Sequence, residues 1–351
     1  MATGWPMKTT YANGDVYSAS DVNDTNGTIN LLGASVAYAA AKNVILNSDY
    51  RIWQRGTSFS GTTDTYTADR WKVESNRTGS AVSQQTFTPG TAPVAGYEGA
   101  FYLRYTPGTG GAYSSLIQRI EDVRTFANTT VTLSYWAKCS TGTITNEPYY
   151  FQNFGSGGSS EVQTALATST ITTSWQRFTQ SFTIPSISGK TIGTSSYLSL
   201  LLIRPSAATS TTIDVWGVQL ERGSTATAFQ TATGTIQGEL AACQRYYWRT
   251  GGSSVYQRIG QGVADSGGAG VLVINPVVMR VAPTSVDSST LALYDGVNII
   301  AVTTCTLPSN AVSPYSVQIT ASGGTSTTNF RIYQLLTNNS TSGYLGLSAE
   351  L

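Results

Sequence analysis

The chain has 351 residues, of which 11% are charged, and its formal net charge is +1. This charged share is well below the ~25% of an average soluble protein, and the near-zero charge excludes the basic footprint of a nucleic-acid-binding protein or of one held on an anionic membrane. There is no histidine, which excludes Ser-His-Asp and Cys-His catalysis and removes the commonest metal ligand.

The length exceeds that of one ordinary core, so we expect two or three domains. The three cysteines, Cys139, Cys243 and Cys305, are odd in number and widely spaced, which predicts reduced, buried thiols rather than disulfides or a zinc site. The start "MATGWPMKTTYANGD" lacks the pattern of a secretion signal, and no apolar run approaches the ~18 residues of a membrane span. We therefore expect synthesis in a cytoplasm without membrane insertion.

Residues 1–42 are predicted to form an N-terminal arm that is partly helical. Asn13-Gly14 favours a turn, and the end "AYAAAK" has high helix propensity. Apolar residues then recur at helical spacing, at Val22, Ile29, Leu32 and Val36. The arm is either a short linker or an assembly segment whose apolar stripe needs a partner outside its own small domain.

Residues 43–232 show a pattern of strands and little else. Short segments with alternating or continuous apolar residues are separated by clusters of Gly, Ser, Thr, Asn and Pro, which predicts an all-β sandwich or jelly roll. The strongest of these segments are residues 100–106, 130–138, 175–185, 196–205 and 211–221.

The order of several motifs in this region resembles the jelly-roll modules, similar to carbohydrate-binding modules, of tailed-bacteriophage tail fibres. The motifs are "NVILNSDYRIWQRGTSF", "YTADRWKV", "LIQRIEDVRTFANTTVTLSYWAK", "SWQRFTQSFTIP" and "IDVWGVQLERGSTATAF". The opening "GDVYSASDVNDTNGTINLL" is similar to the attachment ends of phage virion proteins. The resemblance implies a virion protein, assembled in the host cytoplasm, that docks to other virion proteins through the arm and binds host-surface glycans. It also implies a homotrimer, in which closed symmetry would cover the apolar stripe of the arm.

Two further classes remain open beside a tail fibre. A capsid decoration protein or head fibre could use the same modules for surface adhesion. A glycan depolymerase needs two carboxylates facing one cleft, but nothing in the sequence marks a pair, so we expect no enzyme and no catalytic residue. The carboxylates considered are Glu121, Asp122, Glu147, Glu161, Asp214 and Glu221. No cofactor is predicted; oxygen ligands leave room for a structural calcium ion, without assigning its ligands.

The stretch "NSDYRIWQRGTSFS", residues 47–60, is predicted to begin with a strand beside residues 211–221. Trp53 and Trp216 are then either a sugar platform or part of the packed interior, and the large area that a tryptophan buries favours the interior. In "ADRWKV" we expect Asp69 and Arg70 to form a charge-assisted hydrogen bond, with Trp71 in the core.

The candidate ligand site lies in residues 146–161, "NEPYYFQNFGSGGSSE". Read as a glycine-flanked loop, it offers aromatic rings for stacking on pyranose rings and an amide for their hydroxyls, with Tyr149, Tyr150, Asn153 and Phe154 as the binding residues. The alternative is one more strand, with alternate aromatic residues in the core.

Residues 233–351 are predicted to begin with a short helix that links two β-domains, because Ile236, Leu240 and Cys243 have helical spacing. The rest returns to strands with turn signals at Tyr294-Asp295-Gly296 and Ser322-Gly323-Gly324. We expect a small antiparallel β-domain, arranged as a β-sandwich, whose tip loops are a second place for ligand contact.

Overall fold

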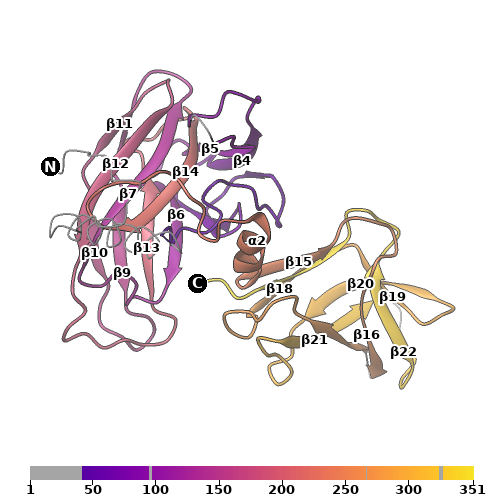
Figure 1. Cartoon of the computed structure of the whole chain (residues 1–351). Coiled ribbons are helices and arrows are strands. Elements are labelled where there is room, and N and C mark those ends of the chain that lie inside the picture. Colours follow the sequence, from indigo (N-terminus) through magenta and orange to yellow (C-terminus); the bar gives the residue numbers. More distant parts are fainter. Residues whose placement is uncertain (1–41, 95–96, 266, 324–326) are drawn as a thin grey trace, which may run out of the picture. The chain divides into compact units, whose positions relative to one another are not determined.

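The computed structural model describes residues 42–94, 97–265, 267–323 and 327–351, and these are nearly all β (Figure 1). Asn43–Leu351 forms one compact unit. The expected all-β class is confirmed by the sheets of this unit. The predicted helical stripe of the arm, Val22, Ile29, Leu32 and Val36, lies outside the described residues.

Two six-stranded antiparallel sheets, with two short extra strands, make up the jelly roll. The first has the order β1 (Ser58–Ser60), β4 (Ala81–Thr86), β5 (Phe101–Thr106), β14 (Ile213–Arg222), β7 (Thr129–Cys139) and β12 (Gln176–Ile184). The second has the order β10 (Val162–Ala165), β9 (Tyr149–Asn153), β13 (Tyr197–Ile203), β6 (Ser114–Glu121), β3 (Trp71–Ser75) and β2 (Asp64–Tyr66). The extra pair is β8 (Ile144–Asn146) with β11 (Ser169–Ile171).

One hydrophobic core takes residues from both sheets. Alternation along β7 sends Val131, Leu133 and Tyr135 into this core, as the period of two requires. Trp53 is half-buried against the same core. Trp216 is fully buried, but in a separate aromatic cluster with Phe87, Trp136 and Phe229. The expectation that both tryptophans are packed rather than displayed is therefore confirmed, although only Trp53 contacts the sandwich core.

The strand predicted at the start of residues 47–60 is wrong, although its neighbour, β14, was identified correctly. Residues near it do lie beside β14, since the Val44 N–H donates to the Leu220 carbonyl (3.2 Å) and the Val218 N–H to that of Ser48 (3.1 Å). Asn47 and Tyr50 then adopt positive φ values of 51° and 57°. Such left-handed residues break a strand, so the chain turns and buries the Tyr50 ring against Trp71.

After helix α2 (Ile236–Gln244), the chain forms a three-stranded sheet and a closed barrel rather than the expected β-sandwich. The sheet has the order β15 (Tyr247–Gly251), β23 (Tyr344–Ser348) and β18 (Ser285–Ser289). The barrel has the order β16 (Arg258–Asp265), β17 (Gly268–Ile274), β21 (Ser316–Gly323), β20 (Ile299–Thr306), β19 (Leu291–Tyr294) and β22 (Ile332–Thr337).

The pairing of β16 with β22 closes the barrel. Glycines allow β16 to lie unusually close to its other neighbour, β17. A Cβ at Gly262 would lie 1.7 Å from the carbonyl oxygen of Gly270, and one at Gly260 would lie 2.5 Å from that of Leu272. Only glycine permits so close an approach of β16 to β17.

Helix α2 begins where the sequence predicts, with the Thr235 hydroxyl accepting from the Gly238 N–H (3.1 Å). Its predicted apolar face is correct only at Cys243, which is buried, because Ile236 and Leu240 are exposed. Glu239 is buried instead and accepts from the backbone N–H groups of Asn47 and Thr233, both at 2.8 Å. Hydrogen bonding to loop backbone, together with the burial of Cys243, thus orients the helix.

A buried polar cluster joins the last residues of the chain to the jelly roll. Arg70 is fully buried, forms an ion pair with Glu350 and donates to the Arg119 carbonyl. Arg55 also contacts Glu350, at 3.3 Å. The expected pairing of Asp69 with Arg70 is wrong, because Asp69 accepts from Gln54 at 2.7 Å and faces Arg55 instead; burial raises the pKa of its carboxyl to about 6. Trp71 lies in the core as expected.

We predict that Glu350→Gln will lower the free energy of unfolding by about 3–5 kcal/mol, because it leaves the buried Arg70 charge without its counter-ion. The control is Asp122→Asn, which removes an exposed pair with Arg124 and should cost about 0–1 kcal/mol. Urea denaturation measures both. Equal losses in the two variants would contradict the role assigned to Glu350.

Candidate functional site

The predicted binding residues lie on a strand rather than in a loop. Tyr149, Tyr150 and Asn153 belong to β9, in which half-buried and buried residues alternate. Tyr150 is buried, its ring stacks on Phe182 with centroids 5.2 Å apart, and its hydroxyl donates to the Thr183 carbonyl (3.2 Å). Phe154 is also buried. These two rings are therefore unavailable to a surface ligand, and the loop interpretation is corrected for them.

The outward residues of β9 form a different set, which we call the β9 face: Tyr149, Phe151 and Asn153, with Tyr197 of the neighbouring strand. The three β9 side chains are half-buried and two residues apart, a spacing of about 7 Å along a strand. Tyr197 of β13 lies directly opposite Asn153 in the ladder. The β9 face thus carries three aromatic rings and an amide on one side of one sheet.

Charged side chains hold the rings of the β9 face in place. The Arg204 guanidinium lies 4.9 Å from the centre of the Tyr149 ring and pairs with Glu147 at 3.2 Å. Arg119 lies 4.7 Å from the centre of the Tyr197 ring. Cation–π contacts of this kind orient an aromatic ring before a ligand arrives. Burial raises the pKa of Tyr197, so its hydroxyl stays neutral and can donate.

The amide of the β9 face has polar partners of its own. Asn153 donates to the Glu161 carboxylate (2.7 Å) and accepts from the Gly155 N–H (3.0 Å). A carboxylate next to an amide supplies both acceptors and donors, which is the combination that hydroxyl groups need. Glu161 lies beyond β9 in the chain and comes back to it because β10 pairs with β9.

Phe151 and Tyr197 were not among the binding residues predicted from the sequence. The signal for Phe151 was present, because a strand interpretation of "YYFQN" places residues 149, 151 and 153 on one face by its period of two. Tyr197 joins them only through the pairing of β13 with β9, which brings together residues 44 positions apart. No local pattern could have indicated that neighbour.

The described part of the chain contains no group of three His, Cys, Asp or Glu residues placed to hold a metal ion. Among the described residues there is also no helix long and apolar enough to cross a membrane.

No protein-family model and no curated protein matches the chain. Among solved structures, the chain is similar to the CBM22-2 xylan-binding domain from Paenibacillus barcinonensis, at 13% identity and a TM-score of 0.33, over 47% of this chain and 99% of that one. It is similar to the C-terminal family 22 carbohydrate binding module from Clostridium thermocellum, at 15% identity and a TM-score of 0.32, over 49% of this chain and 97% of that one. It is also similar to the enzymatically active domain of tailspike protein 4 of bacteriophage CBA120, at 12% identity and a TM-score of 0.31, over 52% of this chain and 21% of that one. At these values the likenesses identify neither a family nor a ligand.

We predict that Tyr150→Ala will lower the free energy of unfolding by about 3–5 kcal/mol, because it leaves a cavity in the core. Tyr149→Ala should cost less than about 1 kcal/mol, because that side chain is half-exposed on the outer face. Denaturant unfolding of the two variants side by side measures the difference. Similar losses would mean that Tyr149 is also a core residue and would remove it from the site.

Proposed function

We propose that the chain is a structural protein of a tailed-bacteriophage virion, a tail-fibre or receptor-binding subunit that adheres to host-surface glycans through the β9 face. The ordered sequence motifs support the virion assignment. One observation carries the glycan assignment: the half-buried side chains of Tyr149 and Phe151 share the outer face of β9, next to the Asn153–Glu161 pair. The arm of residues 1–42 is proposed to attach the protein to the particle and to form the homotrimer.

Recognition follows from the chemistry of the β9 face. Aromatic rings contact the apolar C–H faces of pyranose rings, while amide and carboxylate groups at their edges bind hydroxyls. Because Arg204 already holds the Tyr149 ring, little side-chain freedom is lost there on binding. An open sheet face buries little of a ligand, so each contact is weak. Many copies on one particle then raise the avidity by ~10²-fold or more.

The proposal contains no catalytic step. Three carboxylates beside the β9 face are engaged: Glu147 with Arg204 (3.2 Å), Glu161 with Asn153 (2.7 Å), and Glu121, which lies opposite Tyr197 in the ladder, with Arg245 (3.0 Å). In these positions they orient two cations and an amide. Release of reducing ends from a bound polysaccharide would contradict this part of the proposal.

We predict that Tyr149→Ala and Phe151→Ala will each weaken retention of the full chain on immobilised bacterial surface polysaccharides by about tenfold or more, equivalent to ~1.4 kcal/mol. Each variant removes one stacking ring, and affinity electrophoresis against a panel of such polysaccharides measures the loss.

The matched control for these variants is Tyr113→Ala, which removes an exposed ring of the jelly roll outside the β9 face. It should be retained like the wild type. Wild-type retention in Tyr149→Ala and Phe151→Ala, or equal loss in Tyr113→Ala, would contradict glycan binding at the β9 face.

A further inference from the structure

The outer face of the barrel exposes aliphatic side chains that have no role in the proposed glycan site. Val263 of β16 is 50% exposed, Leu272 of β17 is 55% exposed and Ile274 of β17 is 73% exposed. Ile332 of β22 is also exposed and lies directly opposite Val263 in the ladder. Because β22, β16 and β17 are neighbours in the barrel, these side chains lie on one outer surface, together with Gln261 and Gln334.

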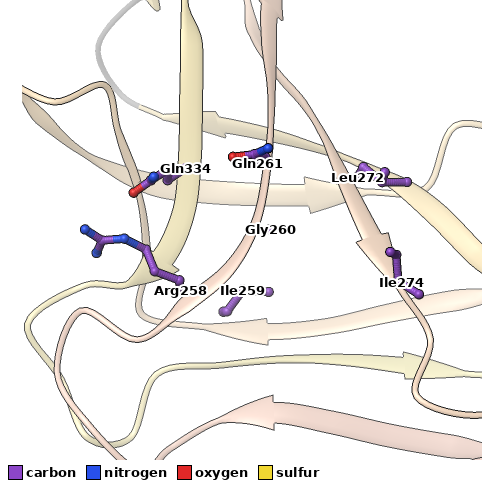
Figure 2. A pocket seen from close by; sticks show the side chains of 7 residues that line it. All are labelled: Arg258, Ile259, Gly260, Gln261, Leu272, Ile274 and Gln334. Atoms are coloured by element: carbon purple, nitrogen blue, oxygen red, sulfur yellow. The ribbon is translucent and has the colours of Figure 1, made fainter.

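Two adjoining hollows lie on this surface. One has a volume of about 450 Å³ and is lined by Arg258, Ile259, Gly260, Gln261, Leu272, Ile274 and Gln334 (Figure 2). The other, of about 440 Å³, shares Gln261 and Leu272 with the first and continues to Asp265, Gly270 and Phe330. We call the two together the barrel groove.

The lining of the barrel groove fits a protein surface better than a glycan. Branched aliphatic side chains lack the flat ring that stacks on a pyranose, and exposed apolar surfaces with a polar rim are typical of protein–protein contacts. Phe330 adds to this, because its backbone has a φ of 65° and its side chain is 89% exposed.

The charges at the two ends of the barrel groove indicate what this partner is. Arg258 is the first residue of β16 and Asp265 the last, and both are exposed. If a second copy packs face to face with its β16 antiparallel, Arg258 of each copy meets Asp265 of the other. The net charge of +1 means that two copies do not repel each other strongly.

We propose that the barrel groove is a contact between two copies of this chain, related by a two-fold axis that lies in the interface and crosses β16 near Gln261 and Gly262. Such an isologous contact uses the same surface twice and pairs each charged end with its opposite. The contact uses neither the β9 face nor the arm. In a chain whose arm forms the proposed homotrimer, it joins copies from two separate trimers, so pairing is measured as association beyond the trimer.

The test uses charge reversal in the full chain. Arg258→Asp and Asp265→Arg should each weaken the pairing by about tenfold or more, because each places like charges together at both ends of the interface. The double variant Arg258→Asp/Asp265→Arg should restore it, because both copies then carry the exchanged charges. Sedimentation equilibrium over a concentration series measures the change, and Arg124→Asp, at an exposed arginine of the jelly roll, is the control that should leave pairing unchanged.

A second variant tests the apolar part of the same contact. Leu272→Asn should also weaken pairing, with an unchanged circular-dichroism spectrum showing that the barrel is folded. Absence of pairing by the wild type at about 100 µM, or failure of the double charge variant to recover, would overturn the proposal. The proposal would also be overturned if Leu272→Asn left pairing unaffected. It would be overturned, too, if the barrel groove bound a soluble polysaccharide and Leu272→Asn abolished that binding.

Discussion

The ion pair between Arg70 and Glu350 is the constraint on which the arrangement of the described unit depends. Arg70 precedes β3 of the jelly roll, whereas Glu350 follows the last strand of the sheet beside the barrel, so the pair closes the chain over 280 residues. Its cost of desolvation is offset by the second arginine, Arg55, and by stacking of Arg70 on Tyr246 at 3.5 Å. Although the protein has few charged residues, three of them, Arg55, Arg70 and Glu350, gather at this one place. They join the end of the chain to the jelly roll.

The period of two along a strand explains both the core and the candidate site. In β9 it sends Tyr150 inward to Phe182 and leaves Tyr149 and Phe151 outside. The buried Tyr150 ring fixes the position of β9, and β9 in turn holds Tyr149 and Phe151 at a constant spacing on its outer face. A site on a sheet is therefore better ordered than the loop site expected from the glycine-rich sequence after it. The site is rigid but shallow, which suits adhesion by many copies.

Most strands could be predicted from the sequence, because their alternation and flanking turn residues are local signals. The failures were of two physical kinds. Positive φ at Asn47 and Tyr50 replaced a strand by a turn, although neither residue is glycine. The other failures came from long-range contacts: Glu350 rather than Asp69 pairs with Arg70, and the pairing of β16 with β22 closes a barrel. At the site, Tyr149 and Asn153 were found by composition, but Phe151 required the correct period and Tyr197 required the strand pairing.

Hydrogen–deuterium exchange of the full chain, with and without a host polysaccharide that it binds, tests the central claim most directly. The account predicts slower exchange confined to β9, β10 and β13, because the ligand covers the outer face of these strands. Protection that falls instead on the barrel strands β16, β17 and β22, or on the aromatic cluster around Trp216, would contradict it.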